Sequence, residues 1–228
     1  MKIAELLSKF INSRKIERPE YTYGSSELYG IMNEYTSAEE YLNPKPFNDE
    51  SCSKMIDGIA MENMFEEILK FNDIPHKYQT NYTISCGSFN PNSKYPVLIE
   101  CHPDFEFDNF IIETKSSDKP LDKLLITYQY QLEVQFRCTN KTIYLGKFSR
   151  PFNLELIRFI PSDKRWKKIS HKIKKFNSQV CRLRKKQKYN QRCLQKNNLL
   201  TLIPQNLTSQ KKPKERLPKI LKPKGKKN

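Results

Sequence analysis

The order of candidate strands and helices is the feature that most restricts the fold of this chain. Alternating apolar positions bounded by turn residues predict five strands, at 77–85, 97–107, 109–116, 141–148 and 152–161. The second and third are joined at Asp108 and Asn109, a pair that suits a tight hairpin. Residues 121–139, between the third and fourth, are long enough for a helix of about five turns. A hairpin, a helix and two more strands predict an α/β fold with a mixed sheet of about five strands.

Helices are predicted on both sides of this central region. Residues 1–15 form an amphipathic pattern, and 53–72 place apolar side chains on one face after Ser53, a suitable N-cap. A third helix is predicted for 162–186, with Ser162 as its N-cap. We therefore predict three regions. Residues 1–52 are helices and loops that pack on the core, 53–186 are the core with a terminal basic helix, and 187–228 are a basic, disordered tail.

Basic residues are concentrated at one end of the chain. Of 41 Lys and Arg, 23 lie in residues 162–228 beside only two acids, whereas residues 1–161 carry 18 basic against 23 acidic side chains. Such asymmetry indicates a polyanionic partner, because Lys and Arg that neutralise phosphates release counterions. A solvated tail or a nuclear address is the alternative interpretation. If the partner is DNA, truncation after Pro161 should weaken its binding.

The remaining composition excludes several classes of protein. No apolar run reaches the roughly 18 residues of a membrane span, and the first residues do not form an export signal, so an intracellular protein, cytoplasmic or nuclear, is expected. The six cysteines contain no C-x-x-C pair, so neither a zinc nor a redox site is predicted. Abundant Lys, Asn and Ile indicate an AT-rich genome, and a virus-encoded protein is one interpretation.

Three side chains of the predicted hairpin have the chemistry of a phosphodiesterase. Asp104 is on one strand, and Glu113 and Lys115 lie on the next, separated by one residue. Because side chains alternate along a strand, Glu113 and Lys115 project from the same face, and the hairpin brings Asp104 to it. Two carboxylates are suitable ligands for Mg²⁺, and an ammonium group beside them can stabilise developing negative charge. An ordinary ion pair on a solvated hairpin is the alternative interpretation.

Four features in order resemble a known family of nucleases. Pro103-Asp104 followed by Glu113-Thr114-Lys115 resembles the motif of the PD-(D/E)xK nucleases. Upstream, Gly58 and Glu62 form a G-x-x-x-E pattern on the predicted helix, and downstream the next helix carries Gln131. The set resembles the RecB-like branch, and within it the phage lambda exonuclease and YqaJ-type viral recombinase proteins. The resemblance covers about residues 53–160, less than half of the chain.

The resemblance implies a restriction-endonuclease-like core and specific roles for the matching residues. Asp104 and Glu113 would bind one or two Mg²⁺ or Mn²⁺ ions, together with the Thr114 carbonyl and with Glu62, directly or through water. Lys115 would act on the attacking water. Gln131 would hold Lys115 or a DNA phosphate. His102 replaces the small residue that often precedes the motif, and either a surface or packing role or a general base is open for it.

Other polar residues near these motifs are weaker candidates. Solvated charges, caps or ordinary hairpin residues are the favoured interpretation for Asp118, Asp122, Glu133, Glu106 and Asp108. Tyrosines near Gln131 could stack on bases or pack in the core. The cysteines lack the clustering of an iron–sulfur site, and none is predicted.

The sequence therefore favours a metal-dependent deoxyribonuclease, an exonuclease rather than an endonuclease, in recombination, repair or viral DNA processing. Its partner would be DNA, bound by basic residues at the start of the last helix, namely Lys164, Arg165, Lys167 and Lys168. The resemblance also implies a homo-oligomer and a recombination or single-strand-binding partner, and no membrane association is expected. The competing hypothesis is a non-catalytic nucleic-acid-binding protein that acts through its basic tail.

Overall fold

The computed structural model describes residues 3–13, 18–88, 95–149 and 153–201. The chain divides into two compact units, Met1–Arg184 and Lys185–Asn228. The described part of the second unit, residues 185–201, is helical. Among the described residues, no helix combines the length and the apolar character that crossing a membrane requires.

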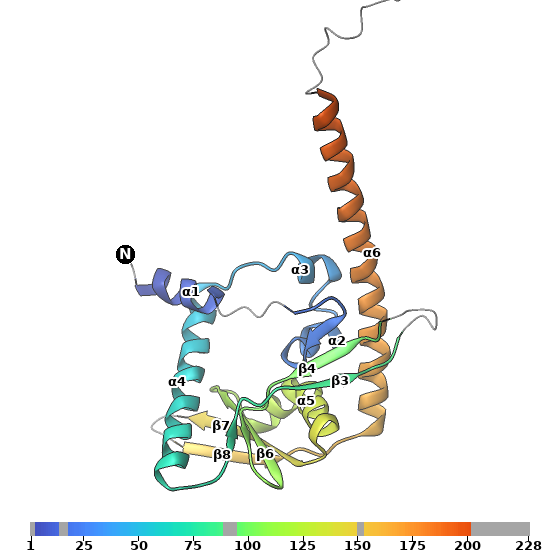
Figure 1. The fold of residues 1–228 in the computed structure, drawn as a ribbon. Coiled ribbons are helices and arrows are strands. Elements are labelled where there is room, and N and C mark those ends of the chain that lie inside the picture. Colours follow the sequence, from blue (N-terminus) through green and yellow to red (C-terminus); the bar gives the residue numbers. More distant parts are fainter. Residues whose placement is uncertain (1–2, 14–17, 89–94, 150–152, 202–228) are drawn as a thin grey trace, which may run out of the picture. The chain divides into compact units, whose positions relative to one another are not determined.

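A five-stranded mixed sheet forms the centre of the first unit (Figure 1). Its order is β2-β5-β6-β7-β8, with bounds Lys77–Tyr78, Phe105–Glu106, Phe110–Ser116, Thr142–Ser149 and Asn153–Arg158. Strands β6 and β7 are parallel and are connected by helix α5 (Leu121–Thr139), whereas the other pairs are antiparallel. This arrangement confirms the predicted α/β fold with a mixed sheet of about five strands flanked by helices. The hairpin turn at Asp108 and Asn109 is also confirmed, since β5 and β6 pair on either side of it.

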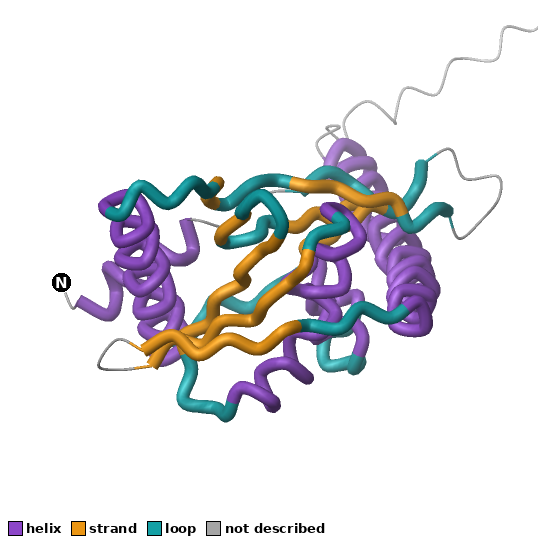
Figure 2. The backbone as a smooth tube through the Cα atoms, turned by 90° about the horizontal axis from the view of Figure 1, so that it is seen from below, coloured by secondary structure: helices purple, strands orange, loops and turns teal. Residues whose placement is uncertain are grey.

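A second, three-stranded sheet was not predicted. It has the order β1-β4-β3, with bounds Thr22–Gly24, Leu98–Cys101 and Tyr82–Ser85. It arises because two predicted strands are each divided between the sheets. Residues 77–85 break near Gln79, which has a φ of 49°, and 97–107 break at Pro103, which has no N–H group for a strand ladder. Figure 2 shows the strands of the unit as continuous orange segments between helices.

The N-terminal half contains the two helices that the sequence patterns predicted, one of them with a different start, and three shorter helical segments. Their bounds are Ile3–Ser13 for α1, Ser25–Glu27 for the short 3₁₀ helix η1, Leu28–Met32 for α2, Ala38–Leu42 for α3 and Asp49–Phe71 for α4. The prediction that α4 begins at Ser53 was wrong. Asn48 is the N-cap, because its side chain accepts a hydrogen bond of 2.8 Å from the Ser51 N–H group. In the extra turn Asp49 and Glu50 are exposed and Cys52 is buried, so a single apolar side chain was too little for the apolar pattern to reveal it.

Helix α5 packs against strands of both sheets, because it contacts β7 and β8 on one side and β3 and β4 on the other. Seven side chains of this helix are consequently buried: Leu124, Tyr130, Gln131, Leu132, Glu133, Val134 and Gln135. Three of these are polar, and buried polar groups require partners. The middle of α5 is therefore a place where polar side chains are held in fixed positions.

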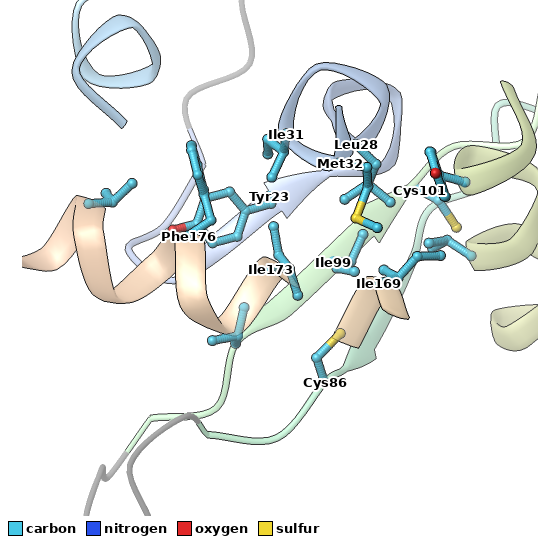
Figure 3. Packing of buried hydrophobic residues seen from close by; sticks show 14 of the residues in the cluster. Tyr23, Leu28, Ile31, Met32, Cys86, Ile99, Cys101, Ile169, Ile173 and Phe176 are labelled. Atoms are coloured by element: carbon cyan, nitrogen blue, oxygen red, sulfur yellow. The ribbon is translucent and has the colours of Figure 1, made fainter. Parts of the chain in front are cut away.

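The first part of the last helix, up to residue 184, packs in the core of the first unit. Helix α6 (Asp163–Thr201) continues beyond position 186, where the sequence pattern had ended it, and the rest of the predicted tail, 202–228, lies outside the described residues. Ile169, Ile173 and Phe176 of this helix are buried against Tyr23 and Ile99 (Figure 3). Truncation after Pro161 would remove part of this core and unfold the unit, so substitutions at the surface of α6 are the appropriate test of DNA binding.

Candidate active site

Asp104 is fixed against the central strand of the five-stranded sheet. It lies in the bend between β4 and β5, and its side chain is buried. Its Oδ2 atom accepts hydrogen bonds from the Thr114 backbone N–H at 2.7 Å and from the Thr114 hydroxyl at 2.9 Å. Thr114 lies between Glu113 and Lys115 on β6, so these two bonds hold Asp104 beside both predicted partners.

Three side-chain donors hold the Glu113 carboxylate. Lys115 Nζ donates to its Oε1 atom in a short ion pair, as does Gln131 Nε2 at 2.6 Å. The other oxygen, Oε2, accepts from Gln135 Nε2 at 2.5 Å. The Glu113 side chain is 1% exposed and the Lys115 side chain 20%, so the ion pair is largely enclosed. Gln131 thus holds the Glu113 carboxylate, whereas the resemblance had it holding Lys115 or a phosphate.

The cluster of Asp104, Glu113 and Lys115 contains more negative than positive charge. Burial and the neighbouring Glu113 carboxylate raise the pKa of Asp104 well above its usual value, although Lys115 opposes this. Burial by itself would lower the pKa of Lys115, but the Glu113 and Asp104 carboxylates outweigh it and raise that pKa. Lys115 is therefore a permanent cation. One ammonium group faces two buried carboxylates, and a further cation at this position would relieve their repulsion.

Glu62 lies on the wall of an open cleft next to this cluster. The cleft has a volume of about 1100 Å³ and is lined by residues of α4, the end of β6 and α5, among them Glu62, Thr114, Lys115, Ser117 and Tyr128. The Glu62 carboxylate is near enough to contribute to the raised pKa of Asp104. Lys115 lies with its Nζ atom 5.1 Å from the centre of the Tyr128 ring. The motif therefore borders the cleft through Thr114 and Lys115, while Asp104 and Glu113 are buried.

The donor set fits a hard divalent cation. Mg²⁺ binds oxygen ligands and commonly uses one or two carboxylates while keeping several waters. Asp104 and Glu113 supply two carboxylates, and Glu62 lies on the cleft wall beside them. In the described ranges no three His, Cys, Asp or Glu side chains converge into a complete ligand cluster, so waters would have to supply the remaining positions.

Two contacts of this site were missed by the sequence analysis. Gln135 was not singled out, although its spacing of four residues from Gln131 places both side chains on one face of a helix. The Thr114 hydroxyl was also missed, since only its carbonyl was considered. The i,i+4 spacing was a usable signal for Gln135, whereas the Thr114 contact depends on the bend at Asp104, which the sequence pattern did not show.

Two of the weaker candidates are buried, Glu133, expected to be a solvated charge or a cap, and Glu106, expected on a polar hairpin face or as an extension of the acidic site. Glu133 is fully buried and accepts bonds from Arg137 at 2.9 Å, from Arg165 at 2.8 Å and from the Ser162 N–H at 2.9 Å, so it joins α5 to the start of α6. Glu106 is also buried. It accepts from the Thr80 hydroxyl at 2.7 Å, from the Tyr82 hydroxyl at 2.8 Å and from Lys141 Nζ at 2.8 Å. Both acids therefore join separate elements of the fold.

The other weak candidates lie at the surface or outside the cluster. Asp108 and Asp122 are exposed, and Asp118 is exposed at the rim of the cleft. His102 is half-buried with its Nε2 atom 3.7 Å from Glu100. None of these residues contacts the Asp104–Glu113–Lys115 group through a described hydrogen bond.

The four basic residues proposed to bind DNA fall into two groups. Lys164, Lys167 and Lys168 are exposed on the outer face of α6. Arg165 instead donates to Glu133, to Gln129 Oε1 at 3.2 Å and to the Ile160 carbonyl at 3.1 Å, and its guanidinium lies over the Phe159 ring. Arg165 is therefore occupied within the fold, while the three lysines are accessible to a partner.

Comparison with known proteins identifies the fold. No family model and no curated protein sequence matches the chain. Among solved structures, an alkaline exonuclease from Laribacter hongkongensis in complex with dAMP matches with a TM-score of 0.50 over 78% of this chain and 95% of that one, at 15% identity. This chain has the fold of that alkaline exonuclease. The crystal structure of SSO0001 matches with a TM-score of 0.55 over 80% of this chain and 87% of that chain, at 16% identity.

The exonuclease fold agrees with the resemblance found in the sequence. At such low identity the likeness concerns the fold and not the individual side chains. The site must therefore be argued from this chain's own residues, in which Lys115 lines the cleft and bonds to the buried Glu113, and Asp104 is held by Thr114.

Proposed function

We propose that this protein is a metal-dependent deoxyribonuclease that hydrolyses phosphodiester bonds of DNA. The observation that carries the proposal is the pairing of two buried carboxylates, Asp104 and Glu113, with the Lys115 ammonium group beside an open cleft. Hydrolysis of a phosphodiester needs neutralisation of the phosphate charge and activation of a water molecule. This constellation contains groups suited to both tasks.

A divalent ion would be held by Asp104 and Glu113, with the Thr114 carbonyl and with Glu62 directly or through water. Mg²⁺ or Mn²⁺, one ion or two, would supply Lewis acidity and lower the pKa of a bound water. Thr114 fixes the position of Asp104 through two hydrogen bonds, and Gln131 fixes that of Glu113. These residues therefore hold the carboxylates in place before substrate arrives, as efficient electrostatic catalysis requires.

Lys115 would stabilise negative charge and would not act as a base. The carboxylates raise its pKa, so it stays protonated at neutral pH and has no free lone pair to accept a proton. Its Nζ atom can donate hydrogen bonds to the attacking water or to a phosphate oxygen. Because only part of the side chain is exposed, this charge would act in a site partly shielded from water, where it is more effective than at an open surface.

An exonuclease is the more specific form of the proposal. The similar alkaline exonuclease was solved with dAMP, a single nucleotide, and this chain shares its fold. A role in recombination, repair or viral DNA processing would follow, with a cytoplasmic or nuclear location. Assembly into a homo-oligomer and contact with a recombination or single-strand-binding protein belong to the same proposal.

Cleavage of DNA with and without metal tests the proposed function. The purified chain should degrade linear duplex DNA in Mg²⁺ or Mn²⁺, and excess EDTA should stop the reaction, because the two carboxylates cannot bind a phosphate unaided. Products from end-labelled and circular substrates would distinguish an exonuclease from an endonuclease. Failure to cut linear, nicked and single-stranded DNA with either metal would contradict the proposal.

A non-catalytic DNA-binding protein is the second candidate function. It is favoured by the exposed lysines of α6, which form a basic surface independent of the cleft. In either case these lysines should bind phosphates. Replacing Lys164, Lys167 and Lys168 together by Ala is expected to weaken DNA binding. The slope of log K against log salt should become shallower by about 0.9 for each phosphate that the variant no longer neutralises.

Fluorescence anisotropy with labelled duplex DNA at several salt concentrations measures this slope. Lys9→Ala, an exposed lysine on α1, is a control that should leave the slope almost unchanged. A triple variant whose salt dependence equals that of the parent would show that this surface of α6 does not bind DNA.

A further inference from the structure

We propose that Gln135 is a positioning residue for the Glu113 carboxylate, and that its amide fixes the orientation in which Glu113 binds a divalent ion. The inference rests on the proposed metal-dependent function. It gives Gln135 a role in the site, although the glutamine that matches the nuclease family in the sequence is Gln131. The position of the Glu113 carboxylate then depends on two side chains of α5, Gln131 and Gln135, and not on Gln131 alone.

The two glutamines hold different oxygens of the same carboxylate. Gln131 Nε2 donates to Glu113 Oε1 at 2.6 Å, and Gln135 Nε2 donates to Glu113 Oε2 at 2.5 Å. With only one of these bonds the carboxylate could still rotate about its terminal torsion, which is a broad and soft degree of freedom. With both bonds, the plane of the carboxylate is fixed relative to α5.

The oxygen atoms of both glutamine amides show that these two bonds are kept although they leave other polar atoms unpaired, which is unfavourable in free energy. Gln131 Oε1 and Gln135 Oε1 are buried and have no hydrogen-bond partner among the residues that the structure describes. An unpaired buried amide oxygen is unfavourable, so such groups are rare in native proteins. Turning either amide over would place its oxygen against the Glu113 carboxylate and lose the N–H bond. Each amide is therefore held with its N–H group toward Glu113.

Packing alone does not explain a glutamine at position 135. The side chain is completely buried, and its immediate neighbours on α5 include the buried apolar residues Leu132 and Val134. A methionine would fill a similar volume without leaving an amide oxygen unpaired. The feature that Gln135 adds is the bond to Glu113, which is a group of the proposed active site.

The bonds also limit how Glu113 can bind an ion. A carboxylate has about four lone-pair positions, and three donors already occupy Glu113, namely Lys115, Gln131 and Gln135. About one position then remains, so Glu113 would bind a metal through a single oxygen and in a fixed direction. Residues that orient a metal ligand in this way commonly change metal affinity by roughly 10–100-fold when they are replaced.

Titration of the full-length protein with Mn²⁺ by isothermal titration calorimetry tests the inference. Gln135→Met should raise the dissociation constant for Mn²⁺ about tenfold or more, with thermal unfolding used to check that it is folded. Gln129→Met is the matched control on the same helix, because Gln129 bonds to Ile126 and Arg165 and not to Glu113. It should bind Mn²⁺ within about twofold of the parent.

Cleavage assays give a second readout that a purely structural role would not change. In Gln135→Met the Mg²⁺ concentration for half-maximal cleavage should rise about tenfold, while the KM for DNA should stay near the parental value. If the methionine variant does not fold, Gln135→Glu takes its place, since it keeps the volume and replaces the N–H donor by an acceptor. It too should bind Mn²⁺ at least tenfold more weakly.

The outcomes separate this inference from the proposed function. A folded Gln135 variant with parental Mn²⁺ affinity and Mg²⁺ dependence, in a protein that cleaves DNA, would overturn the role of Gln135 alone. A parent protein that neither binds Mn²⁺ nor cleaves DNA would overturn the proposed function and this inference with it. Weaker Mn²⁺ binding in the variant, with an unchanged control, would support the inference even before any cleavage is measured.

Discussion

Lys115→Ala is expected to reduce the rate of DNA cleavage by about 10³-fold while leaving DNA affinity within about threefold of the parent. A single donor that stabilises developing negative charge commonly contributes 10²–10³-fold to the rate. Lys115 should lie at the upper end of that range, because its charge also offsets the repulsion between Asp104 and Glu113. The loss corresponds to about 4 kcal/mol of transition-state stabilisation.

Single-turnover cleavage of linear duplex DNA and anisotropy with the same DNA measure the two quantities separately. Lys123→Ala is a matched control, since Lys123 is an exposed lysine of α5 outside the cleft. It should cleave at the parental rate. Cleavage by Lys115→Ala at a rate close to that of the parent would remove Lys115 from the mechanism and would favour the simple DNA-binding protein.

Asp104→Asn is expected to abolish metal binding without destabilising the metal-free fold. Removing a carboxylate ligand should weaken Mn²⁺ binding about 100-fold or more and stop cleavage with it. The folded-state pKa of Asp104 is raised because the group is buried beside Glu113, so its ionised form is destabilised in the folded protein. In EDTA at neutral pH, the neutral Asn should therefore make the free energy of unfolding equal to or higher than that of the parent.

The sign of the pH dependence follows from the same raised pKa. Above the folded-state pKa of Asp104 the parent carries the full cost of the buried charge, and below its unfolded-state pKa, about 3.9, the carboxyl is neutral in both states. The advantage of Asp104→Asn in urea unfolding should therefore vanish as the pH falls below about 4 and grow as the pH rises from there toward neutrality. In Mn²⁺ the parent should have the higher free energy of unfolding of the two proteins, because only the parent gains stability from binding the ion. A variant that is less stable than the parent in EDTA at neutral pH would contradict this account.

The local patterns predicted much of the central fold. The hairpin around Asp108, helix α5 and the strands on either side of it could be predicted because alternation and helical spacing are strong there and turn residues mark the ends. The alternation of β6 predicted that Glu113 and Lys115 share a face, and the two form an ion pair. Asp104 was expected on a strand but lies in the bend between β4 and β5, where it bonds to Thr114.

The features that were missed depend on tertiary structure. The breaks at Gln79 and Pro103 divide two apparent strands between two sheets, and the alternation of side chains continues across both breaks. Glu133 was taken for a solvated residue because a charge on a helix usually is, but α5 lies between two sheets and buries it against Arg137 and Arg165. Burial of this kind depends on which elements meet, and a single sequence does not contain that information.

Locating Mn²⁺ in crystals by its anomalous scattering is the most direct test of the central claim. The account predicts a peak at coordination distance, roughly 2.0–2.2 Å, from carboxylate oxygens of Asp104 and Glu113. The peak should be missing from crystals of Asp104→Asn grown with the same ion. A parent crystal with no peak at these two carboxylates, or with Mn²⁺ bound only elsewhere, would contradict the proposal that they form the metal site of a nuclease.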